Sequence, residues 1–94
     1  MISPVKISII LDREIRRCQA LSLGVDEVIG CAMDRASRAI KALHGGEAAL
    51  ACLKIQSEFW RSLALGVENR SITPIDGDLR FADYVNRLKP NCGL

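Results

Sequence analysis

Apolar residues recur at three- and four-residue steps through two consecutive segments in the middle of the chain. From Val25 to Leu43 they follow one stripe, and charged side chains occupy the opposite side. The same periodicity returns from Glu47 to Val67, where the apolar surface is wider than a single partner helix requires. Because such steps place side chains on one face of an α-helix, both segments are predicted to be amphipathic helices.

A link of only three residues, His44-Gly45-Gly46, separates the two predicted helices. Its two glycines are able to adopt the left-handed backbone conformation that ends a helix. An acidic residue lies in the first turn of each segment, where the positive end of the helix dipole stabilises a negative charge. The sequence therefore predicts an antiparallel hairpin. His44 is expected to lie at the negative end of the first helix and to have no catalytic role.

The segment before the hairpin allows two interpretations. Ser3-Pro4 is typical of a helix start, and apolar residues then recur at helical steps as far as Leu21. Between Val5 and Leu11, however, apolar residues also alternate along the chain, and their β-branched side chains favour a strand. We predict a helix from Asp12 at the latest and leave helix and strand as alternatives for residues 5–11.

After the hairpin the helical pattern weakens. Pro74 and Gly77 mark a connector, predicted over residues 68–77, because proline and glycine interrupt a helix. Asp78 is then expected to cap a short C-terminal helix over residues 78–88.

The predicted fold is a single all-α domain over residues 1–94. It comprises the antiparallel hairpin, an additional N-terminal helix and the short C-terminal helix. A core drawn from 94 residues is small, so we expect apolar faces to pair between copies in a homo-oligomer. Hydrophobic residues make up 49% of the chain but aromatic residues only 4%, which suits close helix packing better than a roomy enzyme pocket.

Charge and hydropathy narrow the class of protein. Thirteen basic and eleven acidic residues give a net charge of +2, which argues against a nucleic-acid partner. The N-terminus lacks the features of a signal peptide, and no apolar run approaches the ~20 residues of a membrane span. The sequence therefore predicts a cytoplasmic protein without a transmembrane segment.

Few residues of the sequence are candidates for a catalytic or metal-binding site. The four cysteines contain no closely spaced pair, and only one histidine is present to complete a metal site, so reduced thiols and no metal or cofactor are expected. Asp76 and Asp78 flank Gly77, but two carboxylates fall short of a calcium site and instead indicate a turn with a helix cap. No credible catalytic set emerges, and the chain is not expected to be an enzyme. The cysteines are Cys18, Cys31, Cys52 and Cys92.

Residues 19–70 resemble the phasins, helical proteins that coat polyhydroxyalkanoate storage granules in bacteria. The segment from Glu47 to Leu50 leads to Leu53-Lys54-Ile55-Gln56-Ser57-Glu58-Phe59, which is similar to the Gln-centred phasin motif, here carried by Gln56 and Phe59. The stretch from Gln19 to Gly24 is similar to the entry of the first phasin arm. The tripeptide between the arms replaces the proline-bearing turn common in phasins, and the residues from Pro74 onward lie outside the family pattern.

The resemblance implies non-catalytic association of an amphipathic hairpin with a polyester granule, through burial of apolar area. Each residue of such a surface is also typical of an ordinary helical core. Gln56 is either a buried hydrogen-bonding residue that sets the helix register or a residue at the edge of the apolar stripe. The expected contact residues are Ile29, Met33, Ile40, Leu53, Phe59, Trp60 and Leu63.

Two other functions remain as alternatives. A strand at residues 5–11 followed by two helices resembles a ribbon-helix-helix DNA-binding regulator, in which Lys6, Ser8 and Ile10 would face the major groove. The apolar Ile10 and the low net charge argue against it. The other alternative is a helical adaptor that binds another protein through the same apolar surface, with residues 78–88 as its anchor.

Overall fold

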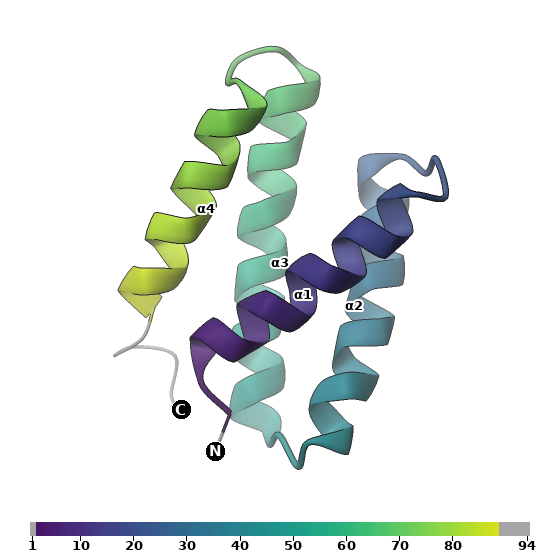
Figure 1. Cartoon of the computed structure of the whole chain (residues 1–94), viewed down its shortest axis with the longest axis vertical. Coiled ribbons are helices and arrows are strands. Elements are labelled where there is room, and N and C mark those ends of the chain that lie inside the picture. The colour runs from purple at the N-terminus through teal and green to yellow at the C-terminus, as the bar shows by residue number, and fades with distance from the viewer. Residues whose placement is uncertain (1, 89–94) are drawn as a thin grey trace.

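The computed structural model describes residues 2–88, which form α1 (Pro4–Gln19), α2 (Val25–Ala42), α3 (Glu47–Glu68) and α4 (Pro74–Leu88). Within this part of the chain every regular element is a helix, so the all-α prediction is confirmed. Figure 1 shows α2 and α3 as the arms of an antiparallel hairpin, α1 crossing them diagonally, and α4 running back beside α3. The hairpin helices end within one residue of the predicted positions.

Residues 5–11 belong to α1, so the strand interpretation is wrong. Ser3 caps the helix, because its Oγ accepts a hydrogen bond from the Lys6 backbone N–H at 3.2 Å, and Pro4 occupies the first turn. Burial follows the helical period: Ile7 is fully buried, whereas Ile9, two residues later, is 63% exposed. The paired strand that a ribbon-helix-helix domain requires is therefore absent from these residues.

The turn of the hairpin differs from the expected one. His44 has φ 58° and is the left-handed residue, whereas Gly46, with φ −85°, has extended backbone and is the N-cap residue that precedes α3. Gly45 is needed for a different reason, namely its close approach to Ile40. A Cβ at position 45 would overlap the Ile40 Cγ2 atom and lie 2.9 Å from the Ile40 carbonyl oxygen, which accepts the Gly45 N–H.

The last helix begins at Pro74 instead of Asp78. The Thr73 hydroxyl accepts a hydrogen bond from the Asp76 N–H at 3.2 Å, and a proline in the first helical position lacks only an N–H that would be unpaired there. Pro74 thus opens a helix where we expected it to extend a connector. Asp78 lies inside the helix and does not cap it.

The buried core comes from three of the four helices. One apolar face of α1, including Ile7, Leu11 and Ile15, packs on the hairpin, where small side chains such as Ala32, Ala36 and Ala49 let the helices approach closely. By contrast, among the side chains of residues 74–87 in α4, Val85 is the one buried hydrophobic side chain. The described structure is therefore a three-helix core with α4 laid against it.

Polar contacts also join the core helices. The Gln56 amide of α3 is fully buried and donates to the Pro4 carbonyl oxygen of α1 at 3.0 Å. Arg61 of α3 forms a hydrogen-bonded ion pair with Asp26 of α2. Of the two interpretations of Gln56, the buried hydrogen-bonding residue is the one observed.

Candidate functional site

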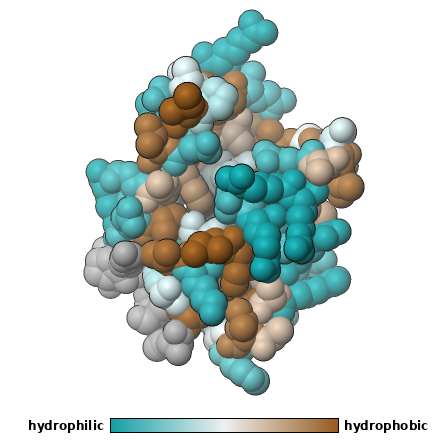
Figure 2. Space-filling view, in the orientation of Figure 1, coloured by the Kyte–Doolittle hydropathy of each residue, from teal (hydrophilic) through white to brown (hydrophobic). Residues whose placement is uncertain are grey.

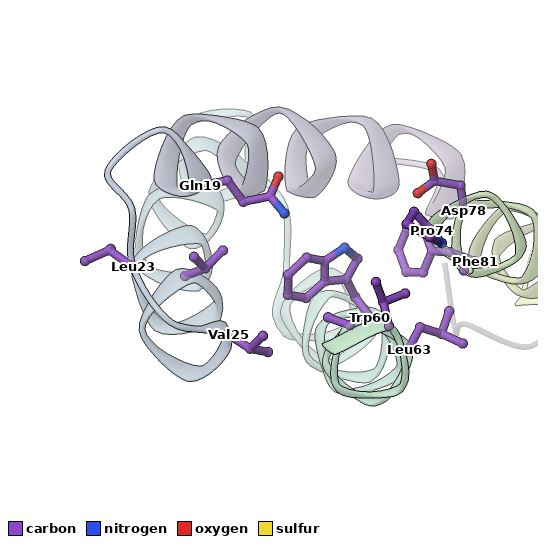
Figure 3. A pocket seen from close by; sticks show the side chains of 12 residues that line it. Gln19, Leu23, Val25, Trp60, Leu63, Pro74, Asp78 and Phe81 are labelled. Carbon is purple, nitrogen blue, oxygen red and sulfur yellow. The ribbon is translucent and has the colours of Figure 1, made fainter. Parts of the chain in front are cut away.

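A cavity of about 260 Å³ lies where the second half of α3 meets the ends of the other three helices. In Figure 3 the Trp60 indole occupies its middle, Gln19 of α1 reaches toward it, and Phe81 and Pro74 bound it from α4. The polar side chains of the lining are Gln19, Asp78 and the indole itself. The complete lining is Gln19, Leu23, Val25, Val28, Trp60, Leu63, Ala64, Val67, Pro74, Gly77, Asp78 and Phe81.

Helical spacing brings these side chains to one place. Trp60, Leu63, Ala64 and Val67 follow three- and four-residue steps along α3 and therefore share a face. Gly77 is the point where α4 approaches this face, since a Cβ added there would touch Val67 Cγ2 at 3.4 Å. Facing helices thus bound a partly open hollow whose lining residues are mostly apolar.

Aromatic rings hold α4 to α3 beside the cavity. Phe59 of α3 stacks on Tyr84 of α4, with ring centroids 3.8 Å apart and planes at 17°, and Phe81 lies 6.5 Å from Phe59. Burial raises the pKa of the Tyr84 hydroxyl, and the negative charge of Glu58 raises it in the same direction. The Phe59 face is therefore covered by α4.

The seven residues expected to form the contact surface lie in different environments in the structure. Ile40 and Leu53 are fully buried in the three-helix core and offer no accessible area. Phe59 lies against α4, whereas Trp60 and Leu63 line the cavity. The remaining two, Ile29 and Met33 of α2, are partly buried against the core.

Sequence reasoning missed the residues that α4 contributes to the cavity. Pro74 and Gly77 were placed in a connector, so their position opposite Trp60 was not foreseen. The signal was present in Thr73-Pro74, a capping residue followed by a proline suited to the first helical position. Phe81 was likewise omitted from the expected surface.

The phasin-like motif lies at the joints between α3 and its neighbours. Gln56 holds the start of α1, and its Oε1 atom has no hydrogen-bond partner within residues 2–88. Phe59, three residues later, holds α4 through Tyr84. The two motif residues therefore face different helices and do not form one exposed contact.

The thiols occupy several environments. Cys18 and Cys31 are free, and burial first, then the neighbouring Cys31 thiol, raises the pKa of Cys18 to about 11. Cys18 is therefore protonated at neutral pH and a poor nucleophile. Cys52 is disulfide-bonded, so the expectation of reduced thiols is wrong there, because spacing along the chain does not show which sulfurs meet in space. Cys92 lies outside the described residues.

Two further observations on residues 2–88 concern metal binding and membrane spans. No group of three or more His, Cys, Asp or Glu side chains in this range is arranged to hold a metal ion. The helices described here also lack the combination of length and hydropathy needed to cross a membrane.

The structure defines a small helical protein with a hollow around Trp60 that is lined mostly by apolar residues. The chain matches no protein-family model, and neither a curated protein nor a solved structure shows significant similarity to it.

Proposed function

We propose that this chain is a non-catalytic, phasin-like protein that associates with an apolar surface, of which a polyhydroxyalkanoate granule is the example, and with further copies of itself. The observation that carries the proposal is the apolar hollow around Trp60, which lies on the helix that bears the phasin-like motif. Association of this kind needs apolar area and no reacting group.

The chemistry of the hollow supports binding over catalysis. Gln19 and Asp78 come from different helices at its rim, and no histidine, cysteine or serine belongs to the lining. Removing apolar area from water stabilises an association by about 25 cal/mol per Å². Trp60 and Leu63, both partly exposed, are suited to supply such area.

Exposed apolar side chains outside the hollow offer further apolar area for association. Ile75 and Leu79 of α4 are 73% and 64% exposed, and Ile9 of α1 is also exposed. Figure 2 shows several apolar areas on the face that bears α1 and α4, divided by hydrophilic side chains. The apolar areas on this face are thus separate.

The proposal is tested with a fluorescently tagged chain in cells filled with polyester granules. The expected result is a fluorescent ring around each granule, and diffuse fluorescence would refute granule association. A charge placed in the hollow by Leu63→Lys should release the protein from the granules. Ser62→Lys is the matched control, because it adds the same charge at the exposed neighbouring position and should leave the ring intact.

A helical adaptor is the second candidate, favoured by the outward side of α4. Ile75 and Leu79 are one helical turn apart and point away from the core, as anchor residues of a helix-in-groove interface do. Co-purification from the native host should then recover a stoichiometric protein partner. Ile75→Ser with Leu79→Ser should abolish that recovery, while granule association through the hollow should remain.

A further inference from the structure

We propose that the hollow around Trp60 is a binding site for a small organic cation that carries a trimethylammonium group. The site shares its position with the proposed function but does not rest on it, because a cation bound there needs no polyester. Three features of the described lining carry the proposal: aromatic rings on two helices, a carboxylate without an ion pair, and few hydrogen-bonding groups.

Aromatic side chains from two helices meet at the hollow. In Figure 3 the Trp60 indole projects into it from α3, and the Phe81 ring lies across from the indole on α4. The face of an aromatic ring carries partial negative charge, and tryptophan attracts a cation most strongly of the three aromatic residues. A cation between α3 and α4 therefore meets an aromatic side chain from each helix.

The charge of the lining favours a positive ligand. Asp78 of α4 brings a carboxylate to the rim, and within residues 2–88 it takes part in no ion pair. No lysine, arginine or histidine is among the described residues that line the hollow. Arg61, next to Trp60 in the chain, is already paired with Asp26. The hollow thus presents a negative charge that no lining side chain neutralises.

The scarcity of hydrogen-bond acceptors selects the kind of cation. An ammonium group with three N–H donors needs an acceptor for each donor that leaves water. Among the described lining side chains, acceptor oxygens belong to Asp78 and Gln19, and most of the others are apolar. Methyl groups on the nitrogen need no acceptor and are able to pack against side chains such as Leu63 and Val67. A trimethylammonium group therefore fits the lining better than a primary ammonium.

The hollow is formed without a ligand, and its size suits a small one. Phe59 of α3 stacks on Tyr84 of α4 with ring centroids 3.8 Å apart, which holds the two helices together beside the hollow. Its volume of about 260 Å³ falls below the roughly 300–1,000 Å³ of sites for drug-sized ligands. The expected ligand is a small alkylated ammonium compound, for which choline is the simplest probe.

The test is a titration of the full chain with choline. Trp60 is the single tryptophan, so its emission reports binding directly, and a saturable change is expected. The matched ligand is the neutral carbon analogue of choline, in which a tert-butyl group replaces the trimethylammonium group. Because it has the same shape without the charge, it should bind about five-fold more weakly or less tightly still. Sodium chloride at equal ionic strength serves as the blank for salt effects.

Two variants test the residues that recognise the charge. Asp78→Asn removes the carboxylate at nearly constant size and should raise the dissociation constant for choline about two- to five-fold. Phe81→Leu removes the ring but keeps an apolar side chain, and should weaken choline more than the neutral analogue. Asp76→Asn is the control, because it makes the same charge change at an exposed position outside the lining and should leave binding unchanged. Circular dichroism verifies that each variant retains its helices.

Each result decides the question. Preferential binding of choline that both variants weaken and the control leaves unchanged supports the cation site. The absence of a saturable change with choline overturns it, and so does equal binding of the neutral analogue by the wild type, a comparison that depends on the folding of no variant. A folded variant at either position that binds choline as tightly as the wild type also overturns it. The granule assay is separate, since a fluorescent ring without choline binding retains the proposed function and rejects the cation site.

Discussion

The side-chain amide of Gln56 donates a hydrogen bond to the backbone carbonyl of Pro4, at 3.0 Å and across 52 residues of sequence. This contact fixes the start of α1 against the middle of α3. It also gives a structural role to the central residue of the phasin-like motif, since Gln56 is fully buried and has no area to offer a partner.

Gln56→Ala should therefore destabilise the fold. The substitution removes a buried hydrogen bond and leaves a cavity, for a combined loss of about 2–3 kcal/mol in the free energy of unfolding. Urea denaturation followed by circular dichroism measures it. The exposed neighbour Glu58 provides the control, because Glu58→Ala should change the stability by less than about 0.5 kcal/mol. Equal effects of the two substitutions would show that the contact contributes nothing.

Substitution of two glycines by alanine should have opposite effects. Gly45→Ala forces a Cβ against the Ile40 side chain and carbonyl, and should cost about 1–3 kcal/mol of stability. Gly30 lies within α2 with no atom within 4 Å of an added Cβ, so Gly30→Ala should stabilise by about 1 kcal/mol through helix propensity. Thermal melting distinguishes them. A Gly45→Ala protein as stable as the wild type would mean that the hairpin turn does not require this close approach.

The Asp26–Arg61 pair should make stability depend on acid pH. The hydrogen bond from Arg61, and then its charge, lowers the pKa of Asp26 from its ordinary value of 3.8. A lowered pKa in the folded state stabilises the protein above pH 3.8, and this contribution disappears as the pH falls through the lowered value. Wild type should exceed Asp26→Asn in stability at pH 7, and the difference should vanish in strong acid.

Denaturant titrations at pH 7 and at successively lower pH values test this prediction. Asp34→Asn serves as control, because Asp34 pairs with Arg38 one turn away in α2 and does not connect two helices. A stability difference between wild type and Asp26→Asn that stays constant down to the acid end would contradict the assigned role of the pair.

The free thiols should differ in reactivity. Because burial chiefly raises the pKa of Cys18 to about 11, its thiolate is scarce at pH 8, whereas Cys31 is partly exposed. Iodoacetamide at pH 8 should modify Cys31 well before Cys18, as peptide mass spectrometry would show. Unfolding in urea should remove the difference. Faster modification of Cys18 in the folded protein would mean that α1 opens more readily than its burial implies.

The hairpin was predictable from sequence because its determinants are local. The helices Val25–Ala42 and Glu47–Glu68 have clear apolar periodicity and acidic first turns, and both agree with the prediction to within one residue. The start of α4 was missed because Pro74 was interpreted as a helix breaker, although its pairing with Thr73 is typical of a helix start. The position of the turn was predicted correctly, but its left-handed residue is His44 and not a glycine.

The candidate site was less predictable. Periodicity identifies an apolar face, but it does not show which helix covers each part of that face. Leu53 and Trp60 are seven residues apart on α3 and lie on similar sides of the helix, yet Leu53 is fully buried and Trp60 lines a hollow. The difference arises because α1 and α2 cover the first half of α3, whereas α4 covers the second half incompletely.

The amino-acid sequence alone determined the helices, their amphipathic faces and the hairpin, because hydrogen bonds, capping residues and apolar spacing within a few residues decide them. Only the tertiary structure decided that residues 5–11 join α1, that Gln56 binds Pro4 and that α4 lies over Phe59 beside an apolar hollow. These features depend on contacts between residues far apart in the chain. Such contacts form only where several faces pack together, and no local pattern specifies which faces meet.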